Sequence, residues 1–210
     1  MRFLGTNKKN SLEKSGGFDE STLATLNDAE LVEKYRAGAE KAFTILVQRH
    51  TGAVYSFVAR YVGGGSEAED IVQDVFVKVW KHLGRFDIQR NFRTWIFTIA
   101  KNTALDWLKK KKAITFSELH THDDTTLFEE TLAADEPLPS DVFDTSRSQE
   151  ELSTALSTLS ADYRAVVLLR LDSQLTFREI AEALGKPLNT VKSHYRRAVG
   201  LLDQQLSRTK

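Results

Sequence analysis

The sequence predicts an all-α protein in which two small helical domains are joined by a flexible acidic linker. Apolar residues recur at helical spacing on both sides of residues 113–148. That stretch is polar, holds Pro137 and Pro139, and is too long to be a loop inside one compact domain. With 210 residues in all, the chain is long enough to form two modest cores.

Composition excludes several kinds of site. The chain has no Cys, so disulfides and thiolate metal sites are excluded, and a reducing cytoplasmic location is expected. It has no apolar run long enough for a signal peptide or a membrane span, so no membrane insertion is expected. The acidic and histidine residues form no ligand or catalytic pattern, so the sequence predicts no metal, no cofactor and no catalytic residue.

Charge is arranged in blocks, although Lys plus Arg equals Asp plus Glu at 29 each. Residues 78–112 contain ten basic and two acidic residues, whereas residues 117–151 contain eleven acidic residues and one basic residue. A polyanion responds to the local field rather than to the net charge. The basic block is therefore a candidate for contact with nucleic acid.

The first domain is expected over residues 26–112, after a polar extension, residues 1–25, that has no helical period and is expected to be mobile. Asn27 and Asp28 are both able to cap the first helix of this domain. A second helix begins near Glu40 and, continuously or after a restart, reaches the three glycines at 63–65.

The next helix, over about residues 66–83, has the most regular pattern in the chain. Ser66 and Glu69 fit a capping box at its start. Its apolar stripe consists of Ile71, Val72, Val75, Phe76, Val79, Trp80 and Leu83. On the opposite side lie polar residues that, on spacing alone, indicate no more than a solvated face: Asp70, Gln73, Asp74, Lys78 and Lys81.

A loop rich in Arg and Asn then leads into a helix over about residues 94–112. Trp95 falls away from the core face of this helix, at about 260° from Ile96 when each residue turns about 100°. Such a Trp can stack on an exposed base or pack under the neighbouring loop, and the sequence leaves both open. The lysines at 109–112 suit phosphate contact, but also complement the helix dipole without a ligand.

The second domain is expected over residues 149–206 as four helices that end in a helix-turn-helix. Thr176 and Glu179 fit a capping box, and Gly185 suits the left-handed residue that ends a helix. Pro187 blocks continuation, and Asn189 can cap the last helix.

The last helix has a buried stripe and a polar face. Val191, Tyr195, Ala198 and Leu202 form the stripe. A basic, hydroxyl-bearing face on the second helix of such a motif suits reading of the DNA major groove. That face consists of Thr190, Lys192, Ser193, Arg196 and Arg197. A solvated helical hairpin is the alternative.

Three motifs in this order resemble a known family. They are SEAEDIVQDVFVKVW, FRTWIFTIAKNTALDWLKKK and, after the acidic linker, LTFREIAEALGKPLNTVKSHYRRA. Together they resemble the bacterial RNA polymerase sigma factors of the small extracytoplasmic-function (ECF) type, which retain only the region two and region four domains. The resemblance covers about residues 28–205. It implies that core RNA polymerase and promoter DNA are the partners, that an anti-sigma factor is a further candidate partner, and that residues 26–112 and 149–206 are regions two and four.

The resemblance also implies residue roles. The polymerase interface would include Asp70, Gln73 and Asp74, in place of a merely solvated face. Region two would read the minus 10 element on the nontemplate strand through Arg90, Asn91, Arg93, Trp95, Lys101, Asn102 and Asp106. Region four would read the minus 35 element, with Ser193, Arg196 and Arg197 reaching bases or nearby phosphates and with Thr190 and Lys192 on phosphate. His194 stands where the family commonly has Arg, at the edge of the buried stripe, which puts phosphate contact there in doubt.

Two other functions compete with this interpretation. An enzyme acting on DNA would need clustered carboxylates or a nucleophile with a positioned base, and the acidic pairs here lie on a helix with another assignment. An operator-binding regulator would use the helix-turn-helix alone and leave the basic helix at 94–112 unexplained. A regulator binds free promoter duplex tightly, whereas a sigma factor binds it well only with core polymerase.

Overall fold

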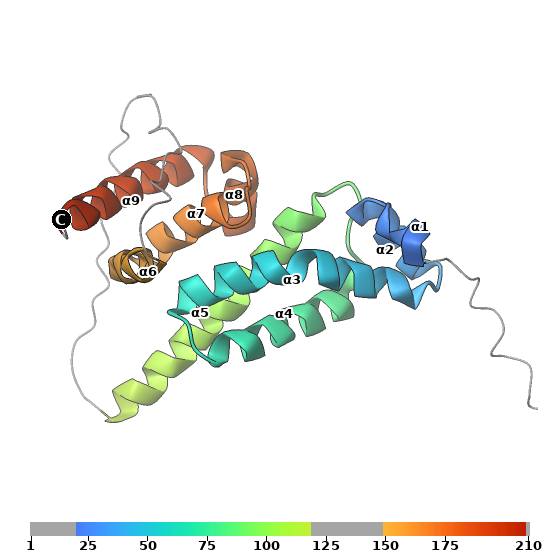
Figure 1. Ribbon diagram of the computed structural model, residues 1–210, viewed down its shortest axis with the longest axis horizontal. Helices are drawn as coiled ribbons and strands as arrows, with labels where there is room; N and C mark the ends of the chain where they lie inside the picture. The colour runs from blue at the N-terminus through green and yellow to red at the C-terminus, as the bar shows by residue number, and fades with distance from the viewer. Residues whose placement is uncertain (1–19, 119–148, 209–210) are drawn as a thin grey trace, which may run out of the picture.

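A computed structural model describes residues 20–118 and 149–208, and within these ranges every regular element is an α-helix (Figure 1). The predicted all-α class is confirmed. The expected linker was 113–148, and its residues 119–148, like most of the N-terminal extension, lie outside the described residues. The helices are α1 (Glu20–Ala24), α2 (Asp28–Arg36), α3 (Glu40–Val62), α4 (Glu67–Leu83), α5 (Phe92–Glu118), α6 (Gln149–Thr158), α7 (Ala161–Leu171), α8 (Phe177–Leu184) and α9 (Leu188–Arg208).

The first domain is built around α3, which packs against α1, α2, α4 and α5. α3 runs unbroken from Glu40 and ends at Gly63, whose φ of 95° places it in the left-handed region. The ordered fold begins earlier than expected, because α1 falls within the predicted mobile extension. Leu23 of α1 is fully buried, and this apolar contact makes α1 part of the domain.

The two predicted helix caps of this domain have different outcomes. The Asn27 side chain accepts a hydrogen bond from the Glu30 N–H, and the Glu30 carboxylate accepts one from the Asn27 N–H, so a full capping box starts α2. The Ser66 cap is wrong. Ser66 already has helical backbone angles, with φ −61° and ψ −26°, and its side chain makes no capping hydrogen bond, because the chain enters α4 through a turn.

α4 and α5 differ from the prediction in the exposure of one side chain and in the two ends of α5. Trp80 was expected in the core stripe but is 54% exposed. α5 begins at Phe92 and extends to Glu118, beyond the predicted domain end at 112. The Lys111 ammonium lies 3.2 Å from the Glu67 carboxylate of α4 and 4.6 Å from the ring centre of Trp107 in its own helix, so a tertiary contact joins the lysine run to α4.

The second domain consists of α6, α7, α8 and α9, as predicted. Thr176 and Glu179 form the expected capping box, and Gly185 ends α8 with a left-handed φ of 62°. The Asn189 cap is wrong, since α9 already begins at Leu188. The Pro187 carbonyl accepts the hydrogen bond from Val191 N–H at the start of α9.

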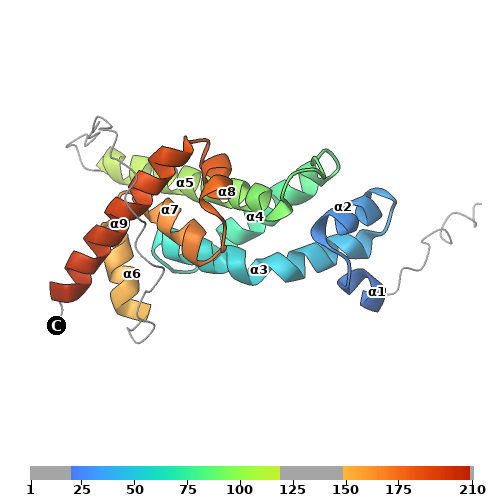
Figure 2. The ribbon, with the colours of Figure 1, turned by 90° about the horizontal axis from the view of Figure 1, so that it is seen from above.

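The two domains are in contact rather than separate. α6 and α7 pack against α3, and α8 packs against α5. Figures 1 and 2 show α1 and α2 at one end of α3 and the α6–α9 domain toward the other end. The buried apolar residues of both domains belong to one contiguous cluster. This contact places α8, the first helix of the helix-turn-helix, against Arg90 and Asn91, which are among the predicted minus 10 residues.

Candidate nucleic-acid interface

The conformation of the loop between α4 and α5, residues 84–91, is stabilised by hydrogen bonds from α2 and by a hydrogen bond within the loop. Arg36, at the end of α2, donates hydrogen bonds to the carbonyl oxygens of Leu83 and Phe86. Inside the loop, the Asp87 carboxylate accepts a hydrogen bond of 3.0 Å from the backbone N–H two residues later. Sequence reasoning missed Arg36, because its contacts join segments almost fifty residues apart.

Asn91 ends this loop and caps α5. Its side-chain oxygen accepts a hydrogen bond of 3.1 Å from the Thr94 N–H, which satisfies a free donor in the first turn. Its side-chain nitrogen donates to the Glu179 carboxylate of α8 at 2.8 Å. Asn before the apolar Phe92 is a recognisable cap signal, and it explains why the helix starts two residues before the predicted Thr94.

Trp95 packs under the loop. Its ring centre lies 4.8 Å from that of Phe86 and 5.5 Å from that of Phe92, and these two rings meet edge to face at 5.5 Å. Of the two alternatives that the sequence left open for Trp95, the structure shows packing under the loop. The Trp95 ring stabilises the loop by packing against Phe86 and Phe92, and this packing does not support stacking of Trp95 on a free base.

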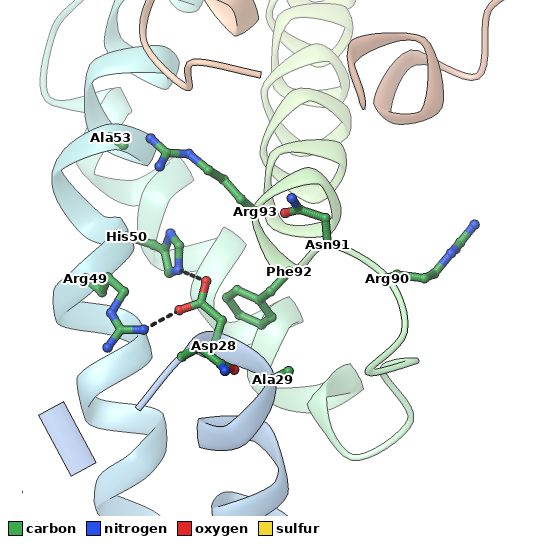
Figure 3. A pocket seen from close by; sticks show the side chains of 10 residues that line it. Asp28, Ala29, Arg49, His50, Ala53, Arg90, Asn91, Phe92 and Arg93 are labelled. Carbon is green, nitrogen blue, oxygen red and sulfur yellow. Dashed lines mark hydrogen bonds and ion pairs between the residues drawn. The ribbon is translucent and has the colours of Figure 1, made fainter. Parts of the chain in front are cut away.

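A cavity of about 470 Å³ lies between α2, α3 and the start of α5 (Figure 3). It brings together three residues predicted to read the minus 10 element, Arg90, Asn91 and Arg93, which are called the loop group below. The Arg93 Nε is buried and has no hydrogen-bond partner among the described residues. The other lining residues are Asn27, Asp28, Ala29, Arg49, His50, Ala53 and Phe92.

Asp28 organises the wall of this cavity. Its two carboxylate oxygens lie 2.6 Å from Arg49 Nη1 and 2.8 Å from His50 Nε2 (Figure 3). Burial by itself raises the pKa of Asp28, but the hydrogen bonds and charges of His50 and Arg49 outweigh it and hold the pKa below 3.8. Arg49 also donates to two carbonyls of the segment that joins α1 to α2, so the cluster fixes both helices to α3.

The remaining predicted minus 10 residues, Lys101, Asn102 and Asp106, lie further along α5 and are called the helix group. Asn102 and Asp106 are exposed, and the half-buried Lys101 places its ammonium 3.4 Å from the Asn102 side-chain oxygen. From Arg93 to Lys101 the helix rises by about 12 Å. The structure thus divides the predicted minus 10 residues into two groups that could contact successive nucleotides of one strand.

The predicted polymerase interface on α4 is exposed and is more apolar than expected. Asp70, Gln73 and Asp74 are all exposed. Val77, with 45% of its surface exposed, and Trp80, with 54%, extend this surface along the helix. The helical spacing could have indicated this, because Trp80 lies seven residues after Gln73 and therefore on nearly the same side. Aromatic side chains are enriched in protein-binding surfaces, and the exposed Trp80 is therefore consistent with such a surface.

The helix-turn-helix presents its predicted face on the first turns of α9. The buried stripe is confirmed, since Val191, Tyr195, Ala198 and Leu202 are at most 1% exposed. His194 faces inward, with its ring centre 5.1 Å from that of Tyr163, which agrees with its predicted place at the edge of the stripe. Among the predicted minus 35 residues Arg197 is exposed, and those that are half-buried are Thr190, Lys192, Ser193 and Arg196.

None of the helices in the described ranges combines the length and hydropathy that a bilayer span requires. Across residues 20–118 and 149–208, no three His, Asp or Glu side chains come together in a way that could hold a metal ion.

Comparison with known families gives two matches, in the same order as the two domains. Residues 46–114 match Sigma-70 region 2, and residues 149–202 match Sigma-70 region 4. The first match begins within α3, contains α4 and ends near the end of α5. The second match contains α6, α7, α8 and α9 except for the last residues of α9. The polymerase-interface residues, the loop group and the helix group fall in the first match, and the minus 35 residues fall in the second.

Curated relatives match over nearly their whole length. ECF RNA polymerase sigma factor SigW of Bacillus subtilis is 30% identical over 83% of this chain and 94% of its own length. ECF RNA polymerase sigma factor RpoE of Cereibacter sphaeroides is 33% identical over 80% and 88% of the two chains. The ECF RNA polymerase sigma-E factor of Escherichia coli is 31% identical over 86% and 95%.

Two solved structures have similar folds. CnrH, determined in complex with the cytosolic domain of CnrY, superposes with a TM-score of 0.64 and 25% identity over 87% of this chain and 99% of that chain. The sigma factor RpoE of Bartonella quintana, determined with the anti-sigma factor NepR, gives a TM-score of 0.62 and 26% identity over 80% and 98%.

Proposed function

This chain belongs to the ECF family of RNA polymerase sigma factors and directs promoter-specific transcription initiation, and we propose that its three surfaces divide that work. The exposed surface of α4, with Asp70, Gln73, Asp74, Val77 and Trp80, binds core RNA polymerase. The loop group and the helix group bind the minus 10 element, and the polar face of α9 binds the minus 35 element.

The loop group supports this assignment most directly. Arg90, Asn91 and Arg93 meet at one cavity beside a loop that Arg36 and Trp95 hold in place. Taking a base out of a stacked duplex costs a few kcal/mol, so the protein must supply preorganised contacts to the exposed base or strand. Amide and guanidinium donors on a fixed loop supply such contacts.

The helix-turn-helix supports the second assignment. The capping box and the left-handed Gly185 set the angle between α8 and α9, and the buried stripe of α9 turns its opposite face outward. Hydroxyl and basic side chains at the start of a recognition helix can reach base edges and phosphates in the major groove.

Partners and location follow from the same proposal. Core RNA polymerase and promoter DNA are the primary partners, and the cytoplasm, where they meet, is the location. CnrH was solved with CnrY, and RpoE with the anti-sigma factor NepR, so an anti-sigma factor is a candidate partner for this chain as well.

Reconstitution tests the function. The purified chain is mixed with core polymerase and genomic DNA, and transcription start sites are mapped. We expect co-elution with core polymerase and starts that share a minus 10 and a minus 35 sequence. Tight binding of the chain alone to promoter duplex, without core polymerase, would instead indicate an operator-binding regulator.

A further inference from the structure

The cavity beside the loop group has more basic and donor groups than the minus 10 assignment uses. Besides the loop group, seven residues line it, from the start of α2, from α3 and from the start of α5. Two of them, Arg49 and His50, have basic side chains, whereas Asp28 is the one carboxylate among the ten lining residues. Three guanidinium groups and one carboxylate therefore surround the cavity, and their combined field attracts an anion.

Arg93 has an unused donor in this cavity. Its Nε is buried and has no hydrogen-bond partner among the described residues. Figure 3 shows the Arg93 side chain reaching from the start of α5 toward Ala53 of α3, whereas the Arg90 side chain extends away from the other labelled residues. A buried donor without a partner costs free energy, so a ligand that accepts a hydrogen bond from Arg93 removes this cost.

Two helices also begin at this cavity. The cap and the first two residues of α2 line it, and so do the cap and the first two residues of α5. The first N–H groups of a helix have no acceptor within that helix, and the helix dipole places partial positive charge there. A negatively charged group between these two helix ends and Arg93 is therefore stabilised by both kinds of positive charge.

The acidic side chains around the cavity do not cancel this field. Both oxygens of Asp28 are occupied by basic side chains of α3, and one of them lies 2.6 Å from Arg49 Nη1. Arg90 Nη2 lies 3.3 Å from Glu182 Oε1 of α8. Two of the three guanidinium groups are thus offset by carboxylates. The charge of Arg93 and the partial charges of the two helix ends remain available to a ligand.

The cavity is large enough for more than a phosphate ion. Its volume of about 470 Å³ lies within the range of about 300–1,000 Å³ that is usual for small-molecule sites. The rings of His50 and Phe92, whose centres are 5.2 Å apart, and the methyl groups of Ala29 and Ala53 supply an apolar part next to the cationic groups. A phosphate suits the cationic part, and a flat aromatic ring suits the apolar part. A nucleotide combines both.

We propose that this cavity binds a free nucleotide, with its phosphate at Arg93 and the two helix ends, and that the bound nucleotide competes with the minus 10 strand. The competition, but not the binding site, rests on the proposed function of the loop group, because Arg93 serves both ligands. One guanidinium cannot bind a phosphate of the nucleotide and a phosphate or base of the strand in the same geometry at once. Promoter binding therefore falls as the concentration of the nucleotide rises.

Calorimetric titration of the whole chain, without polymerase or DNA, tests the site. Inorganic phosphate, ADP and GDP are the probes. We expect a nucleotide to bind at one site per chain and about tenfold more tightly than inorganic phosphate, because only a nucleotide uses the apolar part of the cavity. Arg93→Gln should weaken this binding by about tenfold, the loss of one charge-assisted contact. Absence of nucleotide binding, or equal binding of phosphate and both nucleotides, would overturn the proposal.

A second variant keeps Arg93 and changes the opposite wall. Ala53→Glu places a carboxylate toward which Arg93 points, and it should weaken nucleotide binding by about tenfold or more, because the carboxylate competes with the phosphate. Each variant has a control of equal charge change. Arg85→Gln removes an exposed guanidinium of the same loop, and Thr44→Glu adds a carboxylate at an exposed position of α3, and neither residue lines the cavity. Equal weakening in the variants and in their controls would show general charge attraction and refute the site.

The complex of the chain with core polymerase tests the competition. Its binding to the nontemplate strand of a mapped promoter is measured in the absence of RNA synthesis. A nucleotide at about ten times its own Kd should weaken strand binding by about tenfold. The Ala53→Glu complex should not respond, which separates this site from nucleotide sites of the polymerase. Strand binding that does not change with the nucleotide would overturn the competition. If the complex binds no strand at all, the proposed function fails, whereas the titration of the chain alone still decides whether the cavity is a nucleotide site.

Discussion

The Asp28 carboxylate connects three helices through two contacts. It starts α2, it pairs with Arg49 and His50 of α3, and the His50 ring lies 5.2 Å from that of Phe92 at the start of α5. The charge is only partly exposed and is matched by two partners, which is the condition under which a buried ion pair stabilises rather than destabilises. The wall of the cavity at the loop group therefore depends on the ionised form of one side chain.

Replacing Asp28 tests this dependence. Asp28→Asn should lower the free energy of unfolding at neutral pH by about 1–3 kcal/mol, because the buried His50 and the more exposed Arg49 both lose a charged acceptor. The folded-state pKa of Asp28 lies below 3.8, so the contribution of the carboxylate is complete well above that pH and disappears as the pH falls through the lowered pKa. Urea unfolding over a pH series should show the native protein and the variant converging in acid. The exposed Asp106→Asn serves as the control, and a pH-independent difference would contradict the expectation.

Arg197 gives the residue-scale test of minus 35 recognition. It is the exposed member of the predicted face, so its removal should leave the fold intact. Arg197→Ala should reduce transcription from a promoter that depends on its minus 35 element by about tenfold, the loss expected for one good base or phosphate contact. Lys41→Ala removes an equal charge elsewhere. If scrambling the minus 35 sequence affects the variant as strongly as the native protein, Arg197 does not read that element.

Two segments have the sequence pattern of a capping box, but only one of them forms it, which shows how far a local pattern can predict the start of a helix. Thr176 caps α8 with its hydroxyl, whereas Ser66 at α4 makes no cap, because the preceding glycine turn leaves it in a helical conformation. Thr176→Ala should therefore cost about 1 kcal/mol of stability, and Ser66→Ala less than about 0.5 kcal/mol. Chemical unfolding of both variants measures the difference. Equal losses would mean that the hydroxyl of Thr176 contributes nothing specific.

Element positions were predictable where packing and local chemistry agree. Gly185 and the stripe from Val191 to Leu202 were placed correctly, because a turn residue and a helical period specify the same arrangement. Helix ends were less predictable. α5 continues to Glu118, and near its end Lys111 pairs with Glu67 of α4, a partner that is distant in the sequence.

α4 carries the element-scale test of polymerase binding. An apolar residue at helical spacing was expected to be buried, yet Trp80 is exposed on the side that also presents Gln73. Trp80→Ala should leave the unfolding free energy within about 0.5 kcal/mol of native, since little buried surface is lost. It should weaken binding to core polymerase by about tenfold or more, as expected for an aromatic at the centre of an interface. Tyr55→Ala, at a similarly exposed aromatic of α3, is the control, and co-elution with core polymerase is the measurement.

At the scale of the whole molecule, two domains could be predicted from the sequence, but the contact between them could not. The predicted DNA-binding residues lie just before and along α5 and on α9, whereas the pairing of Asn91 with Glu179 and of Arg60 with Asp172 was not predicted. Such contacts leave no periodic signal, since each depends on a single side chain from a distant segment. The same reason explains why Trp95 could not be assigned to the loop or to DNA before the fold was known.

At the same scale, Asp172 of the second domain pairs with Arg60 of α3, with 2.8 Å between Oδ1 and Nη1, and this contact links stability to pH. Burial raises the pKa of Asp172 above 3.8, although Arg60 and the Ser56 hydroxyl oppose the shift. The folded protein therefore binds this proton more tightly than the unfolded chain, and the contribution of Asp172 to the free energy of unfolding falls as the pH rises through the raised pKa. Asp172→Asn should remove this part of the pH dependence, because an amide does not titrate. Urea unfolding of both proteins over a pH series measures the difference, and curves of identical shape would contradict the expectation.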